Sequence, residues 1–222
     1  MTDIQSISYY LLQSKAIKLE PANPFTWASG WKSPIYCDNR RTLSFPAIRN
    51  IIRDALVQTI RKYYPDAEVI AGVATGAIAQ GVLVADVMGL PFVYVRSSAK
   101  GHGLGNQVEG YLEPDKKVVV VEDLISTGGS SLSAVEALRQ TGNPVLGMAA
   151  IFTYGFPLAV ANFAKANCEL HTLTDYNELL QLALESGYIQ PEQLDLLKQW
   201  REAPDQWKGY TGSYLEKDFL FE

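Results

Sequence analysis

Two adjacent acidic residues end an apolar run in this sequence, and a loop of small side chains follows them. The stretch VVVVEDLISTGGSSLSAVEAL, residues 118–138, has these acids at Glu122 and Asp123. Because the loop has almost no bulky side chains, its backbone N–H groups can turn toward one point. The helical pattern after the loop adds about half a positive charge at its N-terminus. Together these features predict an anion site suited to a phosphate.

Carboxylates beside a phosphate site indicate a ligand with a second kind of polar group. Carboxylates accept hydrogen bonds from vicinal hydroxyls, so a ribose 5-phosphate suits both halves of the stretch. The hydroxyls of Ser126, Thr127 and Ser130 would add donors for the phosphate. The structural alternative is that the acids cap the helix and the glycines only turn the chain. The stretch is neither a Walker loop nor a dinucleotide fingerprint, because GxxxxGK[ST] and GxGxxG do not occur in the sequence.

A second segment, VRSSAKGHGLGNQVEG at residues 95–110, places Arg96, Lys100 and His102 among glycines. Few apolar residues hold this segment down, so we expect a mobile loop that closes over a ligand. Three potential cations suit a departing pyrophosphate. The alternative is a solvated loop whose charges only confer solubility.

The spacing of apolar residues predicts the elements that hold these loops. Strands are predicted at residues 68–73, 92–96, 117–122, 145–152 and 169–173, and helices at residues 4–16, 45–64, 78–88, 130–140, 158–166, 175–185 and 191–201. β-Branched runs such as KVVVV are typical of strands buried on both faces of a parallel sheet. The alternation with helices predicts a doubly wound, mainly parallel α/β sheet, whose ligands bind beyond the carboxyl ends of the strands. The segment PANPFTWASGWKSPIYCDNRR predicts turns and short extended pieces.

Composition excludes several other classes of protein. The 222 residues suit one domain, and a net charge of −5 disfavours a nucleic-acid partner. Cys37 and Cys168 form no CxxC or Cys/His group, which disfavours structural zinc and a disulfide framework and favours a reducing compartment. No secretory segment and no apolar run of membrane length is visible. We therefore expect a cytoplasmic protein with no membrane partner.

The motifs together resemble those of the orotate phosphoribosyltransferases, a branch of the type I phosphoribosyltransferases. VVVVEDLISTGGSS resembles the phosphoribosyl pyrophosphate (PRPP) signature, and R-x-x-x-K-x-H-G-x-G resembles the catalytic loop of that branch. FTWASGWKSPIYCDNR is similar to its pyrimidine-binding element, and GVATGA to its pyrophosphate loop. The resemblance implies the type I phosphoribosyltransferase fold in a single domain. Its parts would be an N-terminal hood (residues 1–45), an α/β core (46–187) and a C-terminal helix and tail (188–222).

The resemblance also implies the reaction: ribose 5-phosphate passes from PRPP to orotate, giving orotidine 5′-monophosphate (OMP) and pyrophosphate in pyrimidine biosynthesis. It implies catalytic roles for Lys100, His102 and Asp123. It implies PRPP contacts from Thr75, Gly76, Arg96, Lys100, His102, Glu122, Asp123, Leu124, Ile125, Ser126, Thr127, Gly128, Gly129 and Ser130. Mg²⁺ is expected, bound mainly through PRPP and water rather than by a dedicated protein site. Family members are usually homodimers, so we expect the Arg96–Gly110 loop to act in trans to Asp123.

Departures from the family pattern leave recognition of the orotate carboxylate open. Ala28 replaces a frequent lysine, Ser97 replaces a second basic residue, and no arginine lies near Tyr154. Orotate contacts are therefore expected from Ser126, Lys32 and Tyr36. Two other functions remain open: another type I phosphoribosyltransferase that acts on a purine or uracil, and a non-catalytic regulator that senses PRPP.

Overall fold

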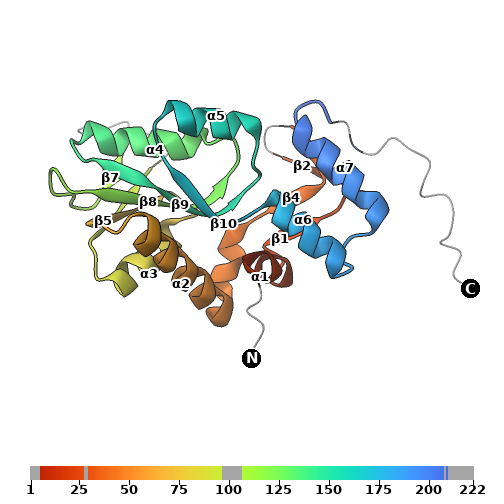
Figure 1. Ribbon diagram of the computed structural model, residues 1–222, viewed down its shortest axis with the longest axis horizontal. Coiled ribbons are helices and arrows are strands. Elements are labelled where there is room, and N and C mark those ends of the chain that lie inside the picture. Colours follow the sequence, from red (N-terminus) through yellow and green to blue (C-terminus); the bar gives the residue numbers. More distant parts are fainter. Residues whose placement is uncertain (1–5, 28–29, 97–106, 208, 210–222) are drawn as a thin grey trace, which may run out of the picture.

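The computed structural model describes residues 6–27, 30–96, 107–207 and 209 (Figure 1). A six-stranded sheet forms its centre, in the order β10-β9-β8-β5-β6-β7. The β6–β7 pair is antiparallel and the other neighbours are parallel. The strands of this sheet are β5 (Val69–Val73), β6 (Phe92–Val95), β7 (Val108–Glu109), β8 (Val118–Ile125), β9 (Val145–Thr153) and β10 (Leu170–Asp175).

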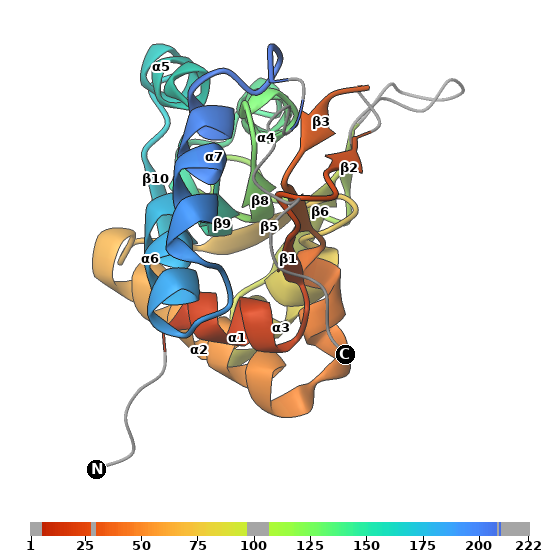
Figure 2. The ribbon, with the colours of Figure 1, turned by 90° about the vertical axis from the view of Figure 1, so that its right-hand side faces the viewer.

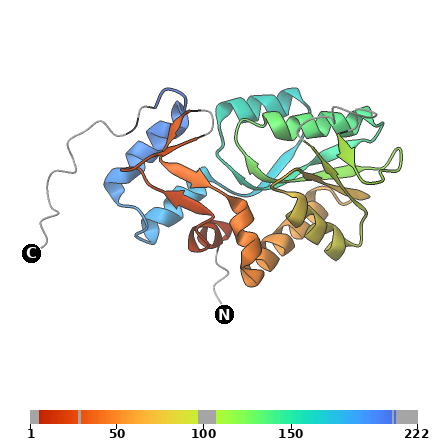
Figure 3. The same cartoon turned by 180° about the vertical axis from the view of Figure 1, so that it is seen from behind.

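Helices cover both faces of the sheet. In Figure 1, α4 (Gly129–Gln140) and α5 (Pro157–Lys165) lie above it, and α2 (Pro46–Tyr63) and α3 (Ile78–Met88) lie below; Figure 3 shows the same layers from behind. Proline at the start of α2 and α5 favours a helix there, because the first turn needs no N–H from it. The apolar face of α2 is buried against the sheet through Ile48, Ile52, Leu56 and Ile60.

The hood and the C-terminal helices pack together at one end of the sheet (Figure 2). Two small antiparallel pairs form the hood, β1 (Ile17–Leu19) with β4 (Ile35–Cys37), and β2 (Phe25–Thr26) with β3 (Lys32–Ser33). The hood also contains α1 (Ile7–Gln13) and the 3-10 helix η1 (Asn39–Ser44). Beside it lie α6 (Tyr176–Glu185) and α7 (Pro191–Glu202).

Aromatic rings join this end of the molecule to the core. Trp200 of α7 is fully buried, and its indole N–H donates to the carbonyl of Lys32 at 3.2 Å. Its ring centroid lies 5.5 Å from that of Trp27 and 5.6 Å from that of Tyr154. Such edge-on contacts add to the free energy of burial, so the cluster fixes the hood against the end of β9.

The predicted doubly wound sheet is confirmed, and two strand ends were wrong. The strand predicted at residues 169–173 continues to Asp175. The strand expected to end at Glu122 continues to Ile125, because β9 supplies partners for these residues as far as Thr153. The short extended pieces predicted within residues 21–41 correspond to β2, β3 and β4. The sequence pattern missed β1, β7 and η1, which are too short to show a period. No helix among the described residues has both the length and the hydropathy of a membrane span.

The order of strands changes direction between β5 and β8. From β5 the chain adds β6 on one side, and it later returns to place β8 on the other side. The register pairs Gly72 with Val121, so the loops after these two parallel strands open at the same edge of the sheet. This topological switch point is where open α/β sheets bind ligands.

Candidate active site

A cavity of about 400 Å³ lies at the switch point. Four segments line this switch-point cavity: the end of β4 with the start of η1, the turn after β5, the end of β8, and the loop that opens α4. The described lining residues are Cys37, Asp38, Arg40, Val73, Ala74, Thr75, Gly76, Glu122, Asp123, Leu124, Ser126, Thr127, Gly128, Gly129, Ser130 and Ser131. The cavity therefore joins the predicted phosphate loop, the acid pair and the GVATGA turn to the hood.

Glu122 and Asp123 lie in different surroundings because they occupy successive positions on β8. Successive side chains of a strand point to opposite faces. The Glu122 carboxylate is buried and accepts hydrogen bonds from the Ser131 hydroxyl (2.8 Å) and from the Asp123 N–H (2.9 Å). Burial raises the pKa of the Glu122 carboxyl well above its ordinary value, and the negative charge of Asp123 raises it further.

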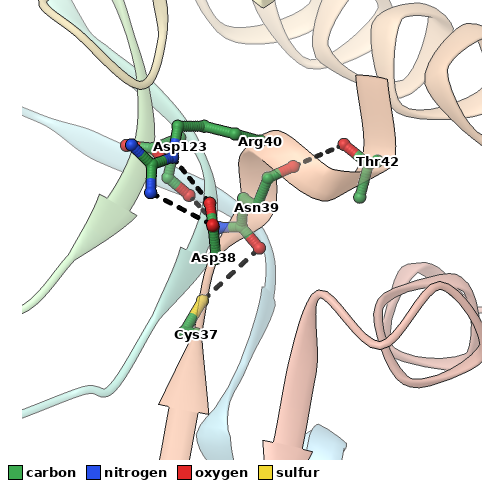
Figure 4. Close-up of polar contacts among 6 residues, drawn as sticks. All are labelled: Cys37, Asp38, Asn39, Arg40, Thr42 and Asp123. Atoms are coloured by element: carbon green, nitrogen blue, oxygen red, sulfur yellow. Dashed lines mark hydrogen bonds and ion pairs between the residues drawn. The ribbon is translucent and has the colours of Figure 1, made fainter. Parts of the chain in front are cut away.

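The Asp123 carboxylate faces the turn after β5. A Cβ atom added to Gly76 would overlap this carboxylate, so the turn can approach it only because residue 76 is glycine. On the backbone side, the Asn39 amide donates to the Asp123 carbonyl at 2.5 Å (Figure 4). Asp123 is thereby held between the core turn and the hood, next to the cavity.

The loop that opens α4 has the form of an anion site. Gly128 has a φ of 81°, a conformation that favours glycine, and a Cβ there would lie 2.7 Å from the ring of Phe163. The amide of Asn162 on α5 holds the loop by donating to the Thr127 carbonyl at 3.0 Å. The first N–H groups of α4, which begins at Gly129, have no partner within the helix and form the positive end of its dipole.

The hood contributes a charged pair that the sequence analysis did not single out. Arg40 binds Asp38 through Nε (2.6 Å) and Nη2 (3.1 Å) (Figure 4). Both residues line the cavity. The thiol of Cys37 donates to Asn39 Oδ1 at 3.4 Å, and burial raises the pKa of that thiol well above its ordinary value. The sequence did contain a signal for this pair. The motif CDNR, residues 37–40, has two charged residues and ends the segment that resembles the pyrimidine-binding element.

Comparison with known proteins decides the family. The phosphoribosyl transferase domain model matches residues 41–169. An orotate phosphoribosyltransferase of Porphyromonas gingivalis is 62% identical over 201 residues, which cover 90% of this chain and 96% of that protein. The chain belongs to the orotate phosphoribosyltransferase family.

Solved structures agree with this membership. The crystal structure of orotate phosphoribosyltransferase from Aeropyrum pernix has a TM-score of 0.73 and 27% identity, over 83% of this chain and 99% of that one. UMP synthase of Leishmania donovani has a TM-score of 0.74 and 26% identity over 90% of this chain. This chain spans 42% of the UMP synthase chain.

The orotate phosphoribosyltransferase fold places most of the predicted PRPP residues around the switch-point cavity. Two that it describes lie outside the lining: Ile125 is fully buried in the core, and Arg96 at the end of β6 pairs with Glu109 at 3.4 Å. Lys100 and His102 fall outside the described residues. Their predicted roles therefore stay predictions.

Of the three residues predicted to contact orotate, one lines the cavity and two lie outside its described lining. Ser126 lines the cavity. Lys32 is exposed and donates to the Thr26 hydroxyl at 2.8 Å, and Tyr36 is 40% exposed with its ring against Phe25. Neither belongs to the described lining. Among the described hood residues, Arg40 is the one that brings a positive charge to the cavity.

Proposed function

We propose that this protein transfers ribose 5-phosphate from PRPP to orotate and releases OMP and pyrophosphate. The observation that carries the proposal is the meeting of three features in one cavity. An anion loop opens α4, a carboxylate ends β8, and a glycine turn after β5 touches that carboxylate. A phosphorylated sugar needs the anion loop for its phosphate and the carboxylate for its hydroxyls. A second phosphate group on the same sugar suits the glycine turn.

PRPP is proposed to lie along the end of β8. Its 5-phosphate would accept hydrogen bonds from the loop Ser126–Ser130 and from the N-terminus of α4. Asp123 would accept hydrogen bonds from the ribose hydroxyls. Glu122 would add the lone pairs that Ser131 and the Asp123 N–H leave unused. The pyrophosphate would then approach the backbone of Thr75 and Gly76.

Catalysis is proposed to rest on positioning and on stabilising the departing charge. The anomeric carbon passes through an oxocarbenium-like state as the bond to pyrophosphate lengthens, as in other glycosyl transfers. Holding two reactants in line can supply about 7–11 kcal/mol of barrier reduction. Arg96, Lys100 and His102 would neutralise the pyrophosphate, and His102 would donate a proton to it. No covalent enzyme intermediate is required.

Mg²⁺ is the expected cofactor, and the chemistry of the cavity fits it. This ion prefers oxygen ligands and is usually held by one or two carboxylates together with substrate phosphates. The Asp123 carboxylate lines the cavity and can take that place. When bound, Mg²⁺ would neutralise charge on the pyrophosphate.

A homodimer is proposed in which the Arg96–Gly110 loop acts in trans to Asp123. Arg96 supports this assignment because it stands at the end of β6, outside the described lining of its own cavity. A cytoplasmic location is also proposed, since the two cysteines are free and far apart in the chain.

The direct test follows orotate absorbance when the purified protein, PRPP and Mg²⁺ are mixed. Loss of absorbance with orotate, and no nucleotide formed from uracil or adenine, is the expected result. Formation of a nucleotide from uracil or a purine in place of orotate would assign another base. Tight PRPP binding without any turnover would assign a sensor.

A further inference from the structure

Under the proposed function, the carboxylate of orotate has no positively charged partner, and Arg40 in the cavity has no assigned substrate group. The 5-phosphate has the α4 loop, and the pyrophosphate has Lys100, His102 and Arg96 under the proposed function. The orotate carboxylate has no assigned partner. Among the described residues that line the cavity, Arg40 alone carries a positive charge, and the same lining contains the acidic residues Asp38, Glu122 and Asp123.

The other described candidates for this carboxylate are occupied elsewhere. Tyr154, at the end of β9, is 2% exposed and stacks on Phe156 at 5.3 Å within the aromatic cluster. Lys32 directs its ammonium group to the Thr26 hydroxyl on the neighbouring hood strand. Neither side chain lines the cavity.

The geometry of Arg40 leaves it able to bind a second carboxylate. A guanidinium group offers five N–H donors in a flat fork. Asp38 takes the edge formed by Nε and Nη2, at 2.6 and 3.1 Å. The other edge, with Nη1, is directed away from Asp38, and the side chain is 59% exposed. Asp38 therefore fixes the direction of the guanidinium without using its full capacity.

We infer that Arg40 binds the carboxylate of the orotate ring and sets the preference for orotate over uracil, an inference that rests on the proposed function. A planar guanidinium matches a carboxylate in two parallel hydrogen bonds. The position of Arg40 in the hood, three residues after the end of β4 at Cys37, brings this charge to the hood side of the cavity. Asp38 is its positioning residue.

The experiment compares two ligands that differ only in this carboxylate. OMP and uridine 5′-monophosphate (UMP) are titrated into the full-length protein by calorimetry, for the unaltered chain, Arg40→Gln, Arg40→Lys and Arg41→Gln. Arg41 is the matched control. It is the next residue of η1, its Nε donates to the Ser14 carbonyl at 3.3 Å, and it does not line the cavity.

In Arg40→Gln, OMP affinity should fall about tenfold to a hundredfold, the range for losing hydrogen bonds to a charged group, while UMP affinity changes less than about threefold. Arg40→Lys should retain part of the preference, and Arg41→Gln all of it. An equal fall for OMP and UMP would place Arg40 on the ribose or phosphate and overturn the inference. An unchanged OMP affinity with a raised KM for pyrophosphate in the reverse reaction would also overturn it. If the unaltered chain bound OMP no more tightly than UMP, the inference would likewise be overturned, while the proposed function would still be decided by orotate turnover.

Discussion

The side-chain amide of Asn39 donates a 2.5 Å hydrogen bond to the backbone carbonyl of Asp123, a residue 84 positions later in the chain. Asn39 is 3% exposed, and its own carbonyl accepts a 2.6 Å hydrogen bond from the Thr42 hydroxyl. The bond therefore ties a short helix of the hood to the strand end that carries the central carboxylate. It restrains the peptide group after Asp123, and with it the backbone from which the Asp123 side chain extends.

Asn39→Ala should raise the KM for PRPP by more than the accompanying loss of protein stability explains. The Asp123 carbonyl loses its partner, which costs about 1–3 kcal/mol of unfolding free energy, and the KM for PRPP should rise about tenfold. The control is Asn143→Ala. Asn143 is another buried asparagine, and it lies just before β9, far from the cavity. Its side chain donates to the carbonyls of Glu113 and Lys116, which precede β8. Equal changes in PRPP KM for both variants would show that Asn39 acts only on stability.

Gly76→Ala should lower turnover about a hundredfold, because the new methyl group would displace the Asp123 carboxylate from its position. The same overlap should cost about 1–3 kcal/mol of unfolding free energy. In an Asp123→Ala background the methyl group meets no carboxylate, so the stability cost of Gly76→Ala should largely vanish. Urea unfolding of the two single variants and the double variant measures this coupling. A cost that is unchanged in the double variant would place the overlap elsewhere.

Glu122→Gln should change how stability depends on pH. The folded-state pKa of Glu122 lies well above its ordinary value of 4.5, because of burial and the charge of Asp123. The stabilising contribution of the protonated form is complete below about pH 4.5 and is lost as the pH rises through the folded pKa. Across that window the unaltered chain should lose about 1.4 kcal/mol per pH unit relative to Glu122→Gln. Urea unfolding of both proteins between about pH 4 and 8 tests this, and a constant difference would contradict the assigned pKa direction.

Mixed dimers should show whether the glycine-rich loop acts in trans. Lys100→Ala should lower turnover strongly while PRPP still binds, and Asp123→Asn should weaken PRPP binding. When the two variants are unfolded together and refolded, half of the dimers are mixed, and each mixed dimer has one intact site. Turnover should then return to about a quarter of the unaltered value. If the mixture gave no more than the two variants give separately, the loop would serve its own subunit.

The sequence predicted the sheet well because each core strand and helix has its own pattern of apolar residues, a continuous run in the strands and a helical spacing in the helices. The VVVV run and the helix at residues 78–88 are examples, and α3 has the predicted bounds. The separate surroundings of Glu122 and Asp123 were not predictable, because they depend on the register of β8 with β9 and on the position of Ser131 in α4. Arg40 was missed for a similar reason: the hood has no period, and its contacts with the core span many residues.

The hydrogen bond from Trp200 to the Lys32 carbonyl joins residues 168 positions apart. During synthesis on the ribosome, the first forty residues emerge long before α7 exists, so the aromatic cluster around Trp27 and Tyr154 lacks its central ring until then. The contact that fixes the hood through α7 is therefore made last, after the phosphate loop has been synthesised. The phosphate loop of a nascent chain would thus be complete before the hood, which carries Arg40, is fixed in place by α7.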